Sequence, residues 1–304
     1  MNSITGININ ISLKRRLSDY KQLAKVGLSI SVVFSSIAGY LLATKAIDYQ
    51  LLLLLGAGGF LIVTASNAFN QIIEKDTDAL MIRTMNRPLP SGRMTTSNAL
   101  VFAITLTIIG LATLYSINPK SALFGAISIF LYTCVYTPLK PVSPLAVFAG
   151  ALPGAIPFMI GWVSATNEVG VEAGFLFMIQ FFWQFPHFWS IGWLQFEDYK
   201  KAGFAMLPVN KKDQSATRQI IFYTMIMVLI SVTPVLKFTG TFYIRPITAI
   251  IIALLGLVML YYGVLLHKKQ TNIEARKLML SSVGYITIAQ IIYVVDKFLH
   301  VYEY

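Results

Sequence analysis

Charge and cysteine are scarce in this chain. Only 12% of its 304 residues are charged and 56% are hydrophobic, which excludes an ordinary soluble domain. The single cysteine, Cys134, lies in an apolar run, so a disulfide framework or a cysteine-based metal site is excluded. The sequence has no GxxxxGK motif or other glycine-rich phosphate loop, which argues against a nucleotide triphosphatase. An integral membrane protein is the class that fits.

Apolar stretches of about 20 residues, the length that crosses a bilayer, recur along the chain. Strand-like alternation is absent, and a lipid-exposed backbone must satisfy its hydrogen bonds internally, so the stretches are predicted to be helices. We expect an all-α polytopic membrane protein, a nine-transmembrane-helix bundle with a central cavity open near the cytoplasmic face. The predicted spans are 26–44, 49–73, 98–116, 120–137, 144–164, 172–194, 218–238, 243–266 and 279–299.

The first 25 residues are polar and lack the short apolar core and cleavage site of a signal peptide. We therefore predict two parts: a cytoplasmic N-terminal arm at 1–25 and a single transmembrane domain at 26–304. If the arm is inside, 19 of the 24 lysines and arginines lie in inside segments. This asymmetry predicts a cell-membrane protein with its N-terminus inside and its C-terminus outside. The net charge of +11 then reflects topology and contact with anionic membrane lipid rather than nucleic-acid binding.

Four polar side chains share one face at the inside end of the second predicted span. On a helix they fall within about 80° of one another; they are Asn67, Asn70, Glu74 and Asp78. Asp76 points to the opposite side. Because unpartnered amides are costly inside an apolar run, the stripe predicts a polar cavity at the cytoplasmic boundary.

Arg83 and Arg87 follow this stripe closely. Oxygen ligands without histidine or cysteine suit Mg²⁺, which proteins hold with one or two carboxylates plus substrate phosphates. Arginine supplies fork-shaped donors for phosphate oxygens. The acids and arginines could instead pair with each other at the surface, where such pairs contribute little. A diphosphate bound through a metal ion would account for both kinds of charge, because the carboxylates would hold the metal and the arginines would bind the phosphate oxygens.

The sixth predicted span and its inside loop carry a second polar face. It consists of Gln180, Gln184, His187, Gln195 and Asp198. His187 either makes an interhelical hydrogen bond or contacts a substrate, and Lys200 and Lys201 either anchor the chain at the membrane surface or bind an anion. Between the two polar faces, Tyr136 and Lys140 end the fourth span on the same side and can offer a hydroxyl and an ammonium to a phosphate.

These motifs together resemble one known family. The pattern Asn70-x-x-x-Glu74-x-x-x-Asp78, followed by Arg83 and Arg87-Pro88-Leu89, resembles the first motif of the UbiA-type intramembrane prenyltransferases. Within that family the chain is similar to the branch that modifies heme, because Ala202 stands where quinone-type enzymes have aspartate. The other matching stretches are 136–140, 150–157, 186–189 and 198–208.

The resemblance implies transfer of a farnesyl group from farnesyl diphosphate to a vinyl group of heme b, giving heme O and diphosphate, with Mg²⁺ as cofactor. It implies that Asn70, Glu74 and Asp78 hold the metal and that Asp198 supports a second metal or orients a cation. It also implies that Arg83, Arg87, Lys140 and Lys201 neutralise the diphosphate, that Tyr136 donates a hydrogen bond, that Asn67 adds to substrate binding and that His187 contacts heme. A downstream heme-modifying enzyme or oxidase is an expected partner.

Two other functions stay open from the residues alone. A quinone-precursor polyprenyltransferase would share the fold and the first motif. A transporter is the different class, since intramembrane polar stripes also form ion pathways. It would carry polar residues across the whole bilayer, whereas the outside halves of the second and sixth spans have almost no charge.

Overall fold

The computed structural model describes residues 3–301, with side chains from 14 to 299, and every regular element in that range is helical. The outermost residues of the two predicted domains, 1–2 and 302–304, lie outside the described residues. In chain order the elements are α1 (Ser3–Ala24), α2 (Val26–Ala43), α3 (Tyr49–Ile73), α4 (Lys75–Leu80), α5 (Thr96–Tyr115), α6 (Pro119–Phe130), the π-helix η1 (Leu131–Tyr136), α7 (Thr137–Leu139), α8 (Ala146–Thr166), α9 (Val171–Leu194), α10 (Phe196–Lys201), α11 (Gln214–Val232), the 3₁₀-helix η2 (Thr233–Leu236), α12 (Pro246–Lys269) and α13 (Asn272–Val301).

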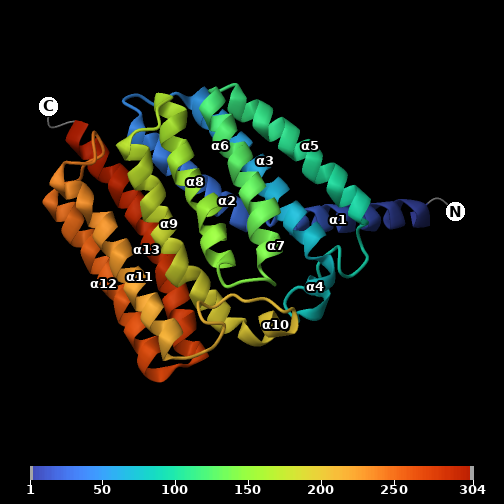
Figure 1. Cartoon of the computed structure of the whole chain (residues 1–304). Coiled ribbons are helices and arrows are strands. Elements are labelled where there is room, and N and C mark those ends of the chain that lie inside the picture. The colour runs from blue at the N-terminus through green and yellow to red at the C-terminus, as the bar shows by residue number, and fades with distance from the viewer. Residues whose placement is uncertain (1–2, 302–304) are drawn as a thin grey trace.

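Eight spans in the described chain are long and apolar enough to cross a membrane, which confirms the all-α membrane architecture. The predicted count of nine is not confirmed by this measure, because α9 is not among the eight. That helix has 24 residues, but Gln180, Gln184 and His187 interrupt its apolar surface. It nevertheless runs through the bundle beside α8, α11 and α13 (Figure 1). The polar residues that make α9 a candidate for function are thus the ones that lower its apolarity.

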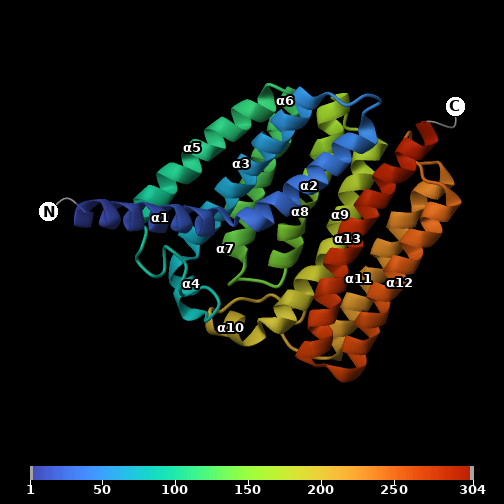
Figure 2. The ribbon, with the colours of Figure 1, turned by 180° about the vertical axis from the view of Figure 1, so that it is seen from behind.

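The segments predicted to lie inside gather at one end of the bundle. The short helices α4 and α10, the end of α7 and the turn between α12 and α13 all lie at the lower end in both views (Figures 1 and 2). The loops that join α2 to α3 and α8 to α9 lie at the opposite end. The alternation of inside and outside segments predicted from the basic residues therefore agrees with the structure, in which the segments that contain α4 and α10 lie side by side.

Helix α8 lies deep in the bundle and crosses α2 at very short range. A Cβ atom at Gly39 would lie 2.1 Å from the carbonyl oxygen of Phe158, and one at Gly161 would lie 2.0 Å from that of Ser36. Only glycine permits this approach, as small residues do at many membrane helix contacts. Further along α8, a Cβ atom at Gly150 would come within 2.7 Å of the Tyr136 ring. The small residues of the 150–157 run therefore make room for a predicted site residue.

The N-terminal arm is helix α1, which projects sideways from the bundle (Figure 2). Its last turns dock on the segment after α4: Arg93 Nε donates to Asp19 Oδ1 at 2.8 Å, and the rings of Tyr20 and Phe102 lie 5.0 Å apart. Leu23 is fully buried at this contact. The end of the arm, and with it the start of α2, is thereby fixed beside the polar end of α3.

Candidate active site

The predicted stripe on α3 forms, although the helix does not continue unbroken. Helix α3 ends at Ile73 and α4 begins at Lys75, with Glu74 (φ −91°, ψ 11°) as the junction. The helical hydrogen-bond pattern still passes through this junction, because Glu74 N bonds to Asn70 O at 2.9 Å and Asp78 N to Glu74 O at 2.7 Å. Glu74 and Asp78 therefore stay on one buried face, while Asp76 is exposed, as the helical geometry predicted.

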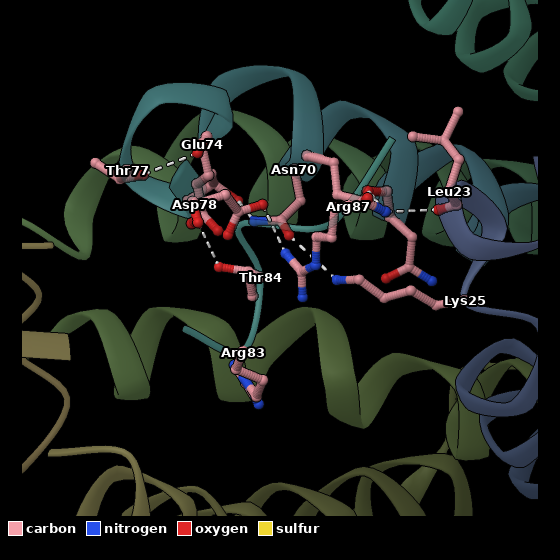
Figure 3. A network of polar contacts seen from close by, with 12 residues as sticks. Leu23, Lys25, Asn70, Glu74, Thr77, Asp78, Arg83, Thr84 and Arg87 are labelled. Atoms are coloured by element: carbon pink, nitrogen blue, oxygen red, sulfur yellow. Dashed lines mark hydrogen bonds and ion pairs between the residues drawn. The ribbon is translucent and has the colours of Figure 1, made fainter. Parts of the chain in front are cut away.

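We call the two buried carboxylates on this face, together with the amide and the cations around them, the inner cluster. Figure 3 shows most of its members pointing toward one another beneath α3. Among the described residues it combines two carboxylates with three cations, so positive charge is in excess. Its members are Lys25, Asn70, Glu74, Asp78, Arg87 and Lys140.

Asp78 is the most deeply buried acid of the inner cluster, with no exposed surface. Its Oδ2 accepts a hydrogen bond from Arg87 at 2.7 Å, and its backbone oxygen accepts one from the Thr84 hydroxyl at 2.8 Å. Burial raises the pKa of Asp78 above its ordinary value, and Arg87 opposes that shift. Its other oxygen, Oδ1, is buried and has no hydrogen-bond partner within the described chain. This free carboxylate oxygen fits a metal ligand.

Lys140 reaches the inner cluster from the end of the fourth span. Its Nζ lies 2.6 Å from Glu74 Oε1 and 4.6 Å from the centre of the Tyr136 ring. Burial acts to lower the pKa of Lys140, but Glu74 and the neighbouring tyrosines outweigh it and raise that pKa. The π-helix η1 ends at Tyr136, just before Thr137, whose hydroxyl accepts from Asn70 Nδ2 at 3.3 Å. Such π-turns are frequent at functional sites, and this one precedes Thr137 and Lys140, which contact Asn70 and Glu74.

Lys25 belongs to the inner cluster but was absent from the predicted site. It lies between α1 and α2 in the left-handed region (φ 46°, ψ 51°), and its Nζ donates to Asn70 Oδ1 at 3.3 Å. Burial, with the nearby Arg87 and Lys140, lowers the pKa of Lys25 to about 7. Lys25 has no carboxylate partner in the part of the chain that the structure describes. A strained, poorly neutralised lysine of this kind is typical of functional sites.

Two amides of α3 hold Lys25 in position by binding the backbone before it. Asn67 Nδ2 donates to Ala24 O at 3.4 Å, and Gln71 Nε2 donates to Leu23 O at 2.8 Å. Asn67, predicted to bind substrate, is thus placed against the α1–α2 junction. The sequence signal for Lys25 was its position as the last cation before the first apolar span, on the same side as the stripe. No local pattern indicates its left-handed backbone.

Three predicted residues form a separate group, which we call the outer cluster: Arg83, Asp198 and Lys201, joined by Tyr199. Asp198 Oδ2 accepts from Arg83 N at 3.3 Å, and Asp198 Oδ1 lies 3.9 Å from Lys201 Nζ. The Arg83 guanidinium donates to the Tyr199 hydroxyl at 3.4 Å. In Figure 3 the Arg83 side chain points away from the inner cluster. The outer cluster therefore joins the segment after α4 to α10, with Arg83 and Lys201 exposed and Asp198 largely buried between them.

The predicted metal ligands are divided between the two clusters. Within the described residues, no group of three histidine, cysteine or acidic side chains could hold a metal ion. Asn70 Oδ1 accepts from Lys25, and Asp198 faces Arg83 and Lys201. Glu74 and Asp78 supply two carboxylates, which is enough for Mg²⁺ only if substrate phosphates complete its coordination. The donor set thus fits a metal that arrives with a phosphorylated ligand.

His187 lies between α9 and α13. Its Nδ1 is 2.8 Å from the Ser282 hydroxyl, and its ring stacks on Trp183 with centroids 4.7 Å apart. The Ser282 hydroxyl also lies 2.6 Å from Met279 O, to which it donates. A Ser282 oxygen that accepts from His187 Nδ1–H leaves the lone pair of His187 on Nε2. The predicted interhelical hydrogen bond is present, and it leaves the other ring nitrogen available.

Helix α9 also carries a buried chain of amides. Gln180 Oε1 accepts from Gln290 Nε2 of α13 at 3.1 Å, and the same nitrogen bonds to Ser35 of α2 at 3.1 Å. Gln184 Nε2 donates to Ala151 O of α8 at 2.9 Å. These bonds tie α9 directly to α8 and α13, and through Gln290 to α2, so two residues of the predicted second face hold the bundle together.

A helical membrane bundle with buried carboxylates and cations at one end belongs to a recognisable class. The model of the UbiA prenyltransferase family matches residues 32–286, and the chain therefore belongs to this family.

Curated relatives narrow the likeness within the family. The chain is 57% identical over 299 residues to a protoheme IX farnesyltransferase of Flavobacterium psychrophilum, covering 97% of this chain and 100% of that one. It is 58% identical over 283 residues to the protoheme IX farnesyltransferase of Christiangramia forsetii, covering 93% and 94% of the two chains.

Solved structures share the fold at low sequence identity. A digeranylgeranylglyceryl phosphate synthase superposes with a TM-score of 0.76 at 22% identity, covering 93% of this chain and 99% of that one. A UbiA homolog from Archaeoglobus fulgidus bound to DMAPP and Mg²⁺ gives 0.71 at 18% identity, covering 92% and 98%. At these identities the likeness establishes the helical architecture.

Proposed function

We propose that this chain transfers the farnesyl group of farnesyl diphosphate to a vinyl group of heme b. Addition of water in the same reaction gives heme O, and diphosphate leaves. The relatives at 57% and 58% identity carry this activity in their names and match nearly the whole chain. The observation that carries the proposal is the inner cluster, where a free buried carboxylate oxygen lies among three cations.

The inner cluster suits a diphosphate with its metal. Lys25, Arg87 and Lys140 can donate to phosphate oxygens, and Arg87 and Lys140 are already held by Asp78 and Glu74. Donors fixed in advance stabilise the charge that develops on the leaving group without reorganising during the reaction. Mg²⁺ held by Glu74 and Asp78, when bound, would neutralise diphosphate as the allylic C–O bond breaks. Burial of the cluster keeps water from the allylic carbon.

The outer cluster has a supporting role in this proposal. Arg83 and Lys201 lie at the surface, where their charges attract diphosphate toward the inner cluster. Asp198 orients both of these cations. Its contact with Arg83 also joins α10 to the segment that follows α4. A direct bond from Asp198 to a second metal would require it to leave Arg83 and Lys201.

His187 is proposed to face the heme. Its Nε2 lone pair can coordinate ferric iron, and the Nδ1 bond to Ser282 fixes the ring. Ferric heme b titrated into the purified protein should give a six-coordinate absorption spectrum. That spectrum should be lost in His187→Ala and restored by added imidazole. An unchanged spectrum in His187→Ala would remove the residue from the heme site.

The inner cluster is proposed to face the cytoplasm, with the N-terminus inside and the C-terminus outside. The support is the concentration of lysine and arginine in the segments at that end of the bundle. A phosphatase reporter joined after residue 304 should be active only if that end lies outside. A reporter that is active only inside the cell would reverse the orientation.

The reaction itself is tested with membranes that contain this protein. They are incubated with heme b, farnesyl diphosphate and Mg²⁺, and the porphyrins are identified by mass. Hydroxyethylfarnesyl heme should accumulate, should disappear with EDTA and should return when Mg²⁺ is added back. Absence of this product, together with prenylation of an aromatic quinone precursor, would replace the proposal with the quinone-type reaction.

A further inference from the structure

A second polar pocket lies outside the inner cluster, beneath α10. It has a volume of about 320 Å³ and lies between α10 and the chain that returns from it toward α11. Neither the metal nor the diphosphate assignment uses it. Its lining consists of Phe196, Lys200, Gly203, Phe204, Asn210 and Lys211.

Two turns of the backbone form part of the pocket wall. Gly203 (φ 72°) and Asn210 (φ 50°) both adopt left-handed conformations at its wall. Gly203 N bonds to Lys200 O at 3.2 Å, and Asn210 N bonds to Leu207 O at 3.0 Å, which closes a turn on each side. A Cβ atom on Gly203 would meet nothing within 4 Å, so glycine is favoured there by its positive φ angle and not by lack of space. Two tight turns thus hold the lining residues in place.

The lining has positive charge without acidic residues. Lys200 and Lys211 have no carboxylate partner among the described residues, whereas Lys201 next to them faces Asp198. Phe196 and Phe204 add two aromatic walls. Two ammonium groups beside aromatic surface suit a flat ligand with carboxylate groups at its edge.

Phe204 lines this pocket and also lies beside the inner cluster. Phe204 is 5% exposed, and its ring lies 5.7 Å from Lys140 Nζ on one side. Lys140 is in turn 2.6 Å from Glu74. A ligand whose charged edge lies in the pocket would therefore have its opposite edge close to the diphosphate site.

We infer that the pocket beneath α10 binds the propionate carboxylates of the heme acceptor and turns its vinyl edge toward the inner cluster. In heme b the two vinyl groups and the two propionates lie on opposite edges of the porphyrin. Carboxylates are costly to bury without partners, so the propionate edge belongs at the aqueous end of the bundle and the apolar vinyl edge inside it. Lys200 and Lys211 are positioning residues in this arrangement, which rests on the proposed heme farnesylation.

The test compares heme b with its propionate dimethyl ester in the double variant Lys200→Met/Lys211→Met. For the native protein the apparent affinity for heme b should exceed that for the ester by about three- to tenfold, the scale of two exposed ion pairs. In the double variant the two porphyrins should bind equally, while the KM for farnesyl diphosphate stays nearly unchanged. Lys268→Met/Arg276→Met removes two exposed cations from the same end of the bundle and should keep the native preference.

Reconstitution in two kinds of vesicle separates porphyrin from lipid. In neutral phosphatidylcholine vesicles the loss of preference should persist. A defect that appears only with anionic phosphatidylglycerol, and equally for both porphyrins, would assign the pocket to a lipid phosphate and overturn the inference. An unaltered preference in the double variant would overturn it as well. Failure of the native protein to farnesylate either porphyrin would instead remove the proposed function.

Discussion

The inner and outer clusters contain the same kinds of side chain in different surroundings. In the inner cluster, ion pairs of 2.6 and 2.7 Å join the buried Glu74 and Asp78 to Lys140 and Arg87. In the outer cluster the contacts of Asp198 are 3.3 and 3.9 Å, and the Lys201 side chain is 55% exposed. Charges interact far more strongly where water is excluded, while exposed pairs are screened and contribute little. Motif residues that are close in sequence thus lie in different surroundings, and we propose chemistry for the inner cluster and substrate approach and loop contact for the outer one.

The largest effect is expected from Asp78→Asn. The amide preserves the shape and can still accept from Arg87, but it removes the charge of the free buried oxygen. Loss of one such electrostatic group lowers kcat by about 10²- to 10³-fold. Turnover is measured by heme O formation at saturating Mg²⁺. A variant that elutes normally in detergent and retains near-native kcat would contradict the metal assignment and weaken the contrast between the clusters.

Lys25→Met is the sharpest test of a residue known only from the structure. Methionine retains the apolar stem but cannot donate to phosphate, so kcat/KM for farnesyl diphosphate should fall about 10- to 100-fold, the scale of one charge-assisted hydrogen bond. The matched control is Lys21→Met, which removes an exposed lysine one turn earlier on α1. Equal losses in the two variants would show that Lys25 contributes only general positive charge.

Arg83→Ala tests the outer cluster. Because this side chain is exposed and its contact to Tyr199 is 3.4 Å, the KM for farnesyl diphosphate should rise about two- to fivefold with little change in kcat. Added salt should reduce the difference between native and variant proteins, since exposed charges are screened. A loss as large as that of Asp78→Asn would mean that Arg83 moves into the inner cluster when substrate binds.

Asp76→Asn should have the smallest effect. The carboxylate lies on the opposite side of the α3–α4 stripe and is exposed, and surface substitutions of this kind usually change energies by about 0.5 kcal/mol or less. Activity within about twofold of native is therefore expected in the heme O assay. A severe loss would show that the junction at Glu74 rearranges during the reaction and brings Asp76 inward.

Much of the fold follows from local sequence. Apolar runs of membrane length predicted the helices to within a few residues at most ends; α3, for example, runs from Tyr49 to Ile73 as expected. Residue spacing on a helix also predicted that Glu74 and Asp78 share a buried face while Asp76 is exposed. Both properties depend on neighbours within one or two turns, which sequence records directly.

Other features depend on contacts between distant segments. Lys25 enters the site because Asn67 and Gln71 bind the backbone at the end of α1, a contact across more than 40 residues. Lys140 reaches Glu74 through a π-turn that no helical periodicity predicts. Asp198 meets the first motif at Arg83, 115 residues away in sequence, and not at Glu74 and Asp78.

The membrane class, the helical stripe of Asn70, Glu74 and Asp78, and the likeness to prenyltransferases follow from the sequence, because apolarity, helical period and motif spacing are local properties. Which charges meet depends on the packing of the whole bundle. It places Lys25, Arg87 and Lys140 around two buried carboxylates, and it leaves Arg83 and Lys201 exposed beside Asp198. Burial is a property of the whole bundle, and it sets how strongly each charge acts.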